Sequence, residues 1–539
     1  MARTPLLRAF QRLAADHRTA EQLGIQPAEL RGRREEASYS RRELLKRAGV
    51  AGGAVAVAGP AAFAPRANAA TAPRIAIVGG GIAGLSAALT LADKGFASTV
   101  YEASTERVGG RMHSDRSGYF ANGQVSEFCG ELIDTGHAAI RGLAKRFNLP
   151  TVDLLAAEPR GSADTYYFLG GDYPLAQADS DFQPVAAILK SQLKAAGYPT
   201  TYASSTDTGR RLDQLSVYDW IEAYVPGGHT SRLGRLLDAA YNEEYGAETT
   251  DQASLNLIYL LAYQPTGQSF EVFGVSDERF HIDGGNERLP EAIANYLGRQ
   301  SIKQGWRMQA IKANTDGTVT VSFGTPGKTQ TVTADHVILS LPFAVLRTLD
   351  FTGAGFDARK STAIAQLGAG RNSKLQLQFS SRYWNAQGST GGVYTDLGIQ
   401  NAWDVTRGQN GATGILVNYS GGNVAGGYAP PTPYSTAAGS AQVTTYAQAF
   451  LEKLETVFPG IMPTWNGKAT LSTPFRDPLL NCSYSYWKPG QYTAFSGYEG
   501  VRQGSIHFAG EHCSQDFQGF MEGGATEGIR AAKEILAAL

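Results

Sequence analysis

The sequence predicts an α/β fold, and three observations support that class. An apolar run at residues 74–78 leads into a glycine-rich turn and then a helical pattern, which is the order of a βαβ unit. Mainly helical periodicity follows over residues 140–261. Near the C-terminus, residues 506–512 predict a strand and a turn, and residues 518–539 predict a helix. We therefore expect a Rossmann-like parallel sheet built from separated segments, a second, mixed sheet and an inserted helical domain.

The composition excludes several classes of protein. The 539 residues carry 48 Lys and Arg against 49 Asp and Glu, so there is no basic excess for binding nucleic acid. Hydrophobic residues make up 42% and charged residues 18%, which is typical of a globular chain. Three cysteines cannot form a disulfide framework, and the eight histidines lack zinc-binding spacing, so we predict no metal site.

The first seventy residues predict a leader that lies outside the fold. Arg41 and Arg42 precede a weakly apolar run at residues 48–65, and a small-x-small pattern follows at residues 67–69. This order resembles a twin-arginine export signal, and the alternative is an amphipathic helix with a linker. We expect export, or a cytoplasmic protein if the leader is retained. Pro60 interrupts the short run, so we expect no stable membrane span.

The first βαβ unit carries the residues of a dinucleotide site. The turn has the pattern GxGxxG, in which Gly79 allows the tight bend and Gly81 lets the backbone approach a pyrophosphate. Gly84 allows close packing of the strand against the helix that we expect at residues 85–94. Glu102 follows at the distance at which an acid accepts hydrogen bonds from a ribose diol. A glycine-rich turn in an ordinary α/β domain is the alternative, which this complete spacing disfavours.

A second motif lies shortly after Glu102. Residues 107–111 form an RxGGR box, whose glycines bring backbone N–H groups near phosphates while Arg111 can neutralise them. Together with the fingerprint, this box resembles the FAD-dependent amine oxidases rather than NAD dehydrogenases. Segments 126–134 and 280–290 and the C-terminal strand, turn and helix resemble the same family. The resemblance extends from about residue 73 to residue 539.

The resemblance implies FAD, with noncovalent binding preferred. Glu511 matches the family acid near the ribityl–pyrophosphate region, and Gly519 and Phe520 match residues beside the flavin ring. The helix N-terminus near Gly524 can stabilise negative charge on the reduced ring. Some relatives bond FAD through a cysteine near the position of Cys482, and a buried inert cysteine is the alternative that we favour. The expected FAD contacts are Gly79, Gly81, Gly84, Glu102, Ala103, Arg107, Gly110, Arg111, Gly130, Glu131, Met308, Glu511, Gly519, Phe520, Met521 and Gly524.

The family chemistry implied is oxidative deamination. A hydride equivalent passes from the amine-bearing carbon to the flavin N5, and O2 reoxidises the flavin to give hydrogen peroxide. Lys374 resembles the family lysine that reaches N5 through a water, and the alternative is a solvent-exposed lysine at a strand end. Phe520 matches one wall of the cage around the amine. Either Trp487 or Tyr484 is expected to supply the other wall, with ordinary core aromatics as the alternative.

The substrate class depends on a cation for an α-carboxylate, for which an arginine is best suited. Where some L-amino acid oxidases carry that arginine, an ungapped comparison gives Leu132. Arg371 is the substitute that we consider, with a surface-loop arginine as the alternative. Segments 131–134 and 276–280 resemble bacterial L-amino acid oxidases more closely than animal monoamine oxidases. We therefore predict an L-amino acid oxidase that uses O2 and forms a homodimer, with a primary-amine or polyamine oxidase as the alternative. A non-catalytic FAD-binding scaffold or a desaturase is less compatible with Lys374 and Phe520.

The expected domain boundaries follow from these segments. Residues 331–342 predict one buried strand, residues 374–379 a half-exposed strand and residues 421–439 a loop. We expect a leader at 1–70, FAD-binding segments at 71–135, 271–345 and 491–539, a helical insert lining a substrate entrance at 136–270 and a substrate-binding domain at 346–490.

Overall fold

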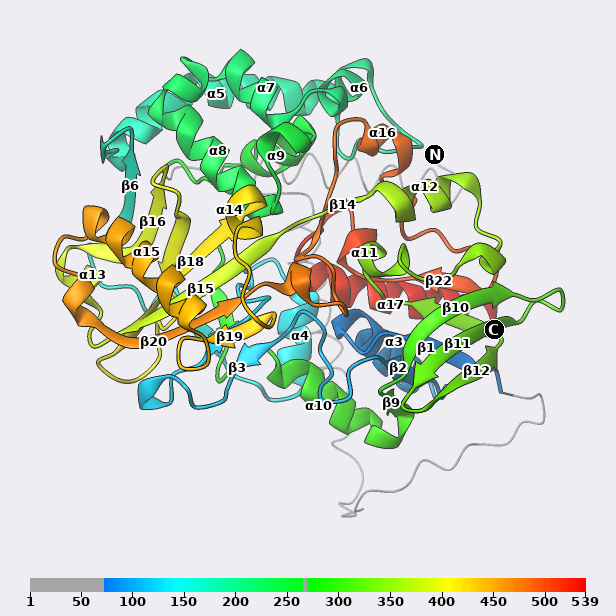
Figure 1. Cartoon of the computed structure of the whole chain (residues 1–539). Helices are drawn as coiled ribbons and strands as arrows, with labels where there is room; N and C mark the ends of the chain where they lie inside the picture. The colour runs from blue at the N-terminus through cyan, green and yellow to red at the C-terminus, as the bar shows by residue number, and fades with distance from the viewer. Residues whose placement is uncertain (1–71, 265–268) are drawn as a thin grey trace, which may run out of the picture.

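The computed structural model describes residues 72–264 and 269–539, so the predicted leader lies outside the described residues. Two sheets form the body of the molecule, and a layer of helices covers one end (Figure 1). The larger sheet carries Lys374, and the smaller sheet carries the glycine-rich turn.

The smaller sheet has five strands, all parallel, in the order β22-β13-β1-β2-β9. The strands are β1 (Ile75–Val78), β2 (Thr99–Glu102), β9 (Ile302–Gln304), β13 (His336–Leu339) and β22 (Ile506–Phe508). They come from three widely separated parts of the chain, which confirms the predicted discontinuous α/β fold class. The apolar strand β1 is buried along its whole length, as a strand covered on both faces must be.

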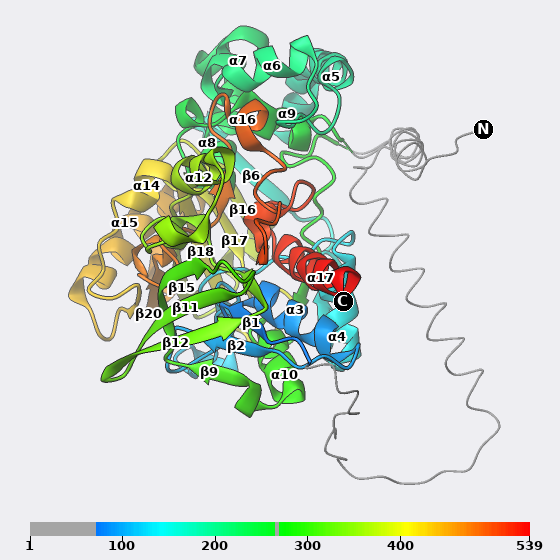
Figure 2. The ribbon, with the colours of Figure 1, turned by 90° about the vertical axis from the view of Figure 1, so that its right-hand side faces the viewer.

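Helices α3 (Ile82–Ala92) and α17 (Met521–Ala538) pack directly against each other beside this sheet (Figure 2). Glycine makes this approach possible, because a Cβ added at Gly528 would lie 2.0 Å from the carbonyl oxygen of Ala83. Helices α4 (Ala138–Arg146) and α10 (Arg288–Leu297) complete the cover. The C-terminal helix therefore belongs structurally to the first βαβ unit.

The predicted single strand at residues 331–342 is wrong, because two strands occupy it. Strand β12 (Lys328–Ala334) ends a three-stranded antiparallel meander with β10 (Arg307–Ala313) and β11 (Val319–Thr325). The chain then passes to β13 through Asp335, whose backbone N–H and carboxylate both bond to Arg74. This tie to the residue before β1 moves the chain from the meander into the parallel sheet.

The larger sheet has eight strands in the order β19-β20-β15-β18-β17-β16-β6-β7, and it is antiparallel except where β16 pairs with β6. Its strands are β6 (Ala163–Phe168), β7 (Gly171–Asp172), β15 (Asn372–Phe379), β16 (Ser389–Thr395), β17 (Gln400–Asp404), β18 (Gly414–Gly421), β19 (Tyr434–Thr436) and β20 (Trp465–Ser472). The first two fall in the stretch predicted as mainly helical. The predicted loop at 421–439 contains β19 and the short helix α14 (Gly422–Gly426).

Strand β15 is buried throughout, so the predicted half-exposed strand is wrong. Its apolar side chains pack beneath α15 (Ala441–Val457). Its glutamines face the other way and donate hydrogen bonds inside the protein: Gln376 to the Glu127 carbonyl and Gln378 to the side chain of Gln124. The alternating polar residues therefore indicate an internal hydrogen-bonded face of the strand here rather than a solvent-exposed face.

The inserted helices form the cap at the top of Figure 1. They are α5 (Leu175–Ala196), α6 (Asp207–Gln214), α7 (Val217–Tyr224), α8 (Arg232–Tyr245) and α9 (Ser254–Leu261). Thr206, Ser216 and Ser231 cap three of them by accepting a hydrogen bond from the N–H three residues later. Among the described helices, none combines the length and apolar character needed to cross a membrane.

Candidate active site

A cavity of about 600 Å³ lies between the two sheets. On one side it is lined by the residues that end β1, β2 and β13, where open α/β sheets bind ligands. On the other side it is lined by Lys374 of β15, Trp403 of β17 and Tyr419 of β18. We call the first side the nucleotide end and the second the substrate end.

Glycines shape the nucleotide end. A Cβ added at Gly81 would meet no atom nearer than 3.9 Å, so a side chain there would enter the cavity rather than the protein. Gly79 has φ +106°, and a Cβ at Gly84 would lie 2.0 Å from the Gly79 carbonyl oxygen. The bend therefore needs Gly79 and Gly84, while Gly81 leaves space for a ligand.

Glu102 is held at the edge of this cradle. Its carboxylate accepts hydrogen bonds from the backbone N–H groups of Gly80, at 2.6 Å, and Ser104, at 2.7 Å. Burial raises the pKa of Glu102, and these backbone bonds oppose the shift. The carboxyl lines the cavity beside Ala103, where a ribose hydroxyl would meet it.

The two arginines of the RxGGR box hold separate segments together. The Arg107 Nε is 2.8 Å from Glu287 Oε1, and its other nitrogens donate to the carbonyls of Gly110 and Met112. Arg111 Nη1 is 2.8 Å from Glu511 Oε1. Glu511 also accepts hydrogen bonds from Ser485 Oγ and from the N–H of Gly519. These guanidinium groups thus fix the wall, and their charges are already paired.

The residues present fit FAD. Every predicted cofactor residue lines the cavity except Gly84, which packs behind the turn. The buried Nδ1 of His113, another lining residue, has no hydrogen-bond partner among the described residues. Cys482 is buried and is not part of the cavity wall, and burial raises its pKa to about 11. A thiol that stays protonated at neutral pH agrees with noncovalent FAD.

A buried ion pair marks the substrate end. Lys374 Nζ lies 2.5 Å from Glu131 Oε2, and both side chains are 6% exposed. Trp403 Nε1 donates to the other carboxylate oxygen of Glu131 at 3.0 Å. Burial raises the pKa of Glu131, but the charge and hydrogen bond of Lys374 outweigh it and hold the pKa below its usual range. Lys374 is therefore buried beside the cavity and is not a solvent-exposed strand-end lysine.

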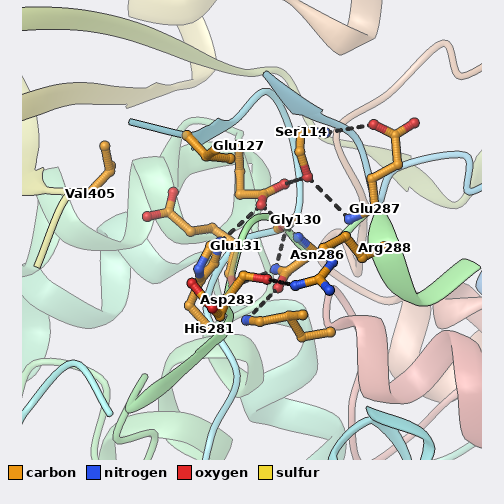
Figure 3. Close-up of polar contacts among 12 residues, drawn as sticks. Ser114, Glu127, Gly130, Glu131, His281, Asp283, Asn286, Glu287, Arg288 and Val405 are labelled. Atoms are coloured by element: carbon orange, nitrogen blue, oxygen red, sulfur yellow. Dashed lines mark hydrogen bonds and ion pairs between the residues drawn. The ribbon is translucent and has the colours of Figure 1, made fainter. Parts of the chain in front are cut away.

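A polar network behind Glu131 fixes its backbone (Figure 3). Asn286 Nδ2 donates to the carbonyl oxygens of Gly130 and Glu131, at 3.0 and 2.7 Å. The N–H of Asn286 donates to Glu127, which also accepts from Ser114 Oγ and contacts His281 Nε2 at 2.9 Å. The network therefore links segments 126–134 and 280–290, which resemble two separate stretches of the family, into one hydrogen-bonded unit.

Aromatic residues complete the wall. Tyr484 lines the cavity, and its hydroxyl lies 2.7 Å from that of Tyr419 and donates to the Glu243 carbonyl. Phe520 lines the cavity as well. Trp487 does not: it lies in the core, where its Nε1 donates to Glu499 Oε1 at 2.9 Å. Of the two candidates for the second aromatic wall, Tyr484 alone is at the cavity.

Arg371 is also away from the site. Its side chain is exposed, it donates to Asn423 Oδ1 at 3.2 Å, and it does not line the cavity. The backbone of Arg371 is drawn toward the end of α8, where its N–H donates to the Gly246 carbonyl. The prediction that Arg371 binds a substrate carboxylate therefore has no support in this geometry.

Several lining residues were not predicted from the sequence, among them Trp403, Tyr419, Glu244 and Glu278. Two acids in succession, Glu243 and Glu244, in a helix that is otherwise mostly buried, were a signal for a polar site. The aromatic residues of β17 and β18 carried no signal, because strand aromatics are usually core.

Comparison with known proteins agrees with this geometry. The family model for flavin containing amine oxidoreductases matches residues 82–536. A putative L-amino-acid oxidase, YobN, of Bacillus subtilis (strain 168) is 26% identical over 488 residues, which cover 86% of this chain and 94% of that protein. The L-amino-acid oxidase of Vipera ammodytes ammodytes is 23% identical over 478 residues, covering 86% and 92%.

Solved structures share the fold. Cyclohexylamine oxidase from Brevibacterium oxydans IH-35A superposes with a TM-score of 0.73 at 21% identity, covering 86% of this chain and 99% of that one. Putrescine oxidase bound to putrescine gives 0.72 at 18% identity, with the same coverage.

Proposed function

The chain belongs to the flavin containing amine oxidoreductases, and we propose that within this family it is an oxidase that deaminates an L-amino acid. The observation that carries the proposal is the single cavity that joins the predicted FAD residues to the Lys374–Glu131 pair. The names of the two L-amino-acid oxidase relatives support the substrate class. Export by a twin-arginine signal and a homodimer stay predictions.

FAD, when bound, supplies the two-electron oxidation of the carbon that carries the amine, and its reoxidation by O2 gives hydrogen peroxide. The chain has to orient the substrate and exclude water. Phe520, Tyr484 and Trp403 form an apolar wall, in which an amine loses its proton more readily than in water. Lys374 is held by Glu131 with its ammonium at the cavity, where it can order a water or a polar substrate group.

A specific observation favours a second candidate, a primary-amine or polyamine oxidase. Among the described residues that line the cavity, Arg107, Arg111 and Lys374 each have a carboxylate partner already. Arg307 adjoins Met308 at the nucleotide end, and Arg371 lies outside. An α-carboxylate would therefore depend on Lys374 and on hydroxyl donors such as those of Tyr419 and Tyr484.

The test is anaerobic mixing of the purified yellow protein with L-amino acids, their D enantiomers and the matching decarboxylated amines. Bleaching of the flavin absorbance near ~450 nm reports electron transfer from substrate to FAD. Bleaching by L-tyrosine or L-lysine, but not by the matching amine, supports the L-amino acid oxidase. Bleaching by the amines alone rejects it in favour of the second candidate. If no compound bleaches the flavin, a scaffold or a desaturase becomes the better explanation.

A further inference from the structure

Two carboxyl groups at the substrate end have no assigned task. Glu244 lies in the last turn of α8, and Glu278 lies in the loop before β8 (Phe280–Ile282). Both line the cavity. Neither carboxylate has a hydrogen bond or an ion pair with any of the residues in 72–264 and 269–539. Both residues are half-buried, and carboxylates withdrawn from water are normally paired, so these two lack a partner that a ligand can supply.

The chain fixes the backbone that carries both side chains. Glu278 has φ +42°, a rare conformation for a residue other than glycine, and its N–H donates to Asp134 Oδ1 at 3.0 Å. Asp134 is fixed in turn by Ser276 Oγ at 2.8 Å. Helix α8 ends in a left-handed glycine, Gly246, at which an added Cβ would lie 2.1 Å from Asn372 Oδ1 on β15. The end of α8 therefore abuts the strand that carries Lys374.

The electrostatics at this place favour a cation. Burial raises the pKa of Glu278 to about 8, and burial together with the charge of Glu278 raises the pKa of Glu244. Burial also raises the pKa of Asp134 to about 7. Arg407 is the cation that opposes the shift at Glu278, but it is bonded to Glu158. A positive ligand would let both glutamates ionise without the cost of an unbalanced buried charge.

The missing cation is organic rather than metallic. Within the described residues, no group of three or more His, Cys, Asp or Glu side chains could hold a metal ion. Tyr245 and Tyr419 line the cavity beside the two glutamates, and aromatic faces stabilise ammonium and guanidinium groups.

We propose that Glu244 and Glu278 form a subsite for a second cationic group of the substrate. The inference rests on the proposed amine oxidation and deepens it. The substrate then carries an ammonium or guanidinium group several carbons from the amine that reacts. A basic L-amino acid and a diamine share this chemistry, and the oxidised amine faces the Lys374 side of the cavity while the distal cation stays protonated between the glutamates.

The experiment compares pairs of substrates that match in length and differ in the distal charge. L-lysine is paired with L-2-aminoheptanoic acid, and 1,5-diaminopentane with hexylamine, so that a methyl group replaces the distal ammonium, using the holoenzyme with FAD bound. We expect the cationic member to have a kcat/KM higher by about thirtyfold or more, because a paired buried charge is worth that much. Lysine without diaminopentane identifies the substrate as an amino acid, and the reverse identifies a diamine. Equal kcat/KM within both pairs overturns the subsite.

The variants Glu244→Gln and Glu278→Gln test whether each carboxyl group recognises the distal cation. Each should lower kcat/KM for the cationic member by about tenfold or more relative to its uncharged partner. Glu452→Gln, which removes an exposed charge on α15, is the matched control and should change neither. Flavin content and melting temperature report whether each variant is folded. An equal loss for both members of a pair rejects charge recognition.

A binding measurement can test the subsite even if the protein does not oxidise amines. If no amine bleaches the flavin, calorimetry of the oxidised holoenzyme with L-lysine and 1,5-diaminopentane still measures binding. Binding of either cation that is weakened in Glu244→Gln supports the subsite although the oxidation proposal has failed. Absence of binding by both cations overturns the subsite.

Discussion

The two ends of the cavity satisfy their charges in opposite ways. At the nucleotide end, Arg107 and Arg111 each pair with a carboxylate of the same chain, and backbone glycine surrounds the space. At the substrate end, Lys374 pairs with Glu131, but Glu244 and Glu278 have no partner among the described residues. Internal pairing gives a fixed shape that suits a cofactor held through many turnovers. Unpaired charge suits a ligand that must arrive, be recognised and leave.

The largest expected effect is at the nucleotide end. Gly81→Val should abolish flavin binding and activity, because the added side chain enters the cavity and meets no protein atom that would unfold the chain. The flavin-to-protein absorbance ratio of the purified variant measures the loss. Gly142→Ala, on the exposed face of α4 with nothing within 4 Å of the added Cβ, is the control and should keep its flavin. If the Gly81→Val protein is yellow and active, FAD does not bind at this end of the cavity.

The second largest effect is expected at the buried ion pair of the substrate end. Lys374→Met should lower the free energy of unfolding by about 3 kcal/mol, because it leaves the Glu131 carboxylate buried and unpaired. Adding Glu131→Gln to this variant should recover most of the loss. Urea unfolding of the two variants and the wild type measures this. If the double variant is no more stable than the single one, the pair does not carry the charge balance described here.

The pH dependence of the free energy of unfolding should reveal the carboxyl groups without a partner at the substrate end. The folded pKa of Glu278, about 8, lies above its unfolded value, so the folded state holds a proton that the unfolded state has lost. Stability should therefore fall as pH rises toward 8, by more than about 1 kcal/mol between pH 6 and pH 8. Glu278→Gln should reduce the slope of this part of the profile without ligand present, and the pKa of Asp134, raised to about 7, leaves the remaining slope. An unchanged slope in that variant would show that Glu278 is not the titrating group.

The smallest effect should follow removal of a charge outside the cavity. Arg371→Ala deletes an exposed side chain with one long hydrogen bond, so stability should change by less than about 0.5 kcal/mol. The KM for an L-amino acid should stay within about twofold of the wild-type value. A large rise in KM with kcat unchanged would return Arg371 to the site as a carboxylate-binding residue.

The nucleotide end could be predicted from the sequence because its residues form local patterns. Gly79, Gly81 and Glu102 belong to one βαβ unit, and the RxGGR box follows a few residues later. The spacing of such motifs is set by backbone geometry, so it is visible before the chain is folded.

The rest of the substrate end, beyond Lys374, Tyr484 and Phe520, could not be predicted, because separate elements supply it. Trp403, Tyr419, Glu244 and Glu278 come from β17, β18, α8 and a loop, and only the tertiary fold brings them together. Nearness in sequence was a poor guide even within one segment. Tyr484 and Trp487 flank the short strand β21 (Ser485–Tyr486), and residues three apart on an extended chain point to opposite faces.

The contact between α3 and α17 has a consequence for how the protein is made. Helix α3 leaves the ribosome early, whereas strand β22 and helix α17, which complete the same sheet and its cover, emerge after all the other described elements. Until they arrive, the glycine turn after β1 lacks the wall that Glu511, Gly519 and Gly524 provide. FAD should therefore bind only after β22 and α17 have been synthesised. A chain stopped before β22 should be released colourless.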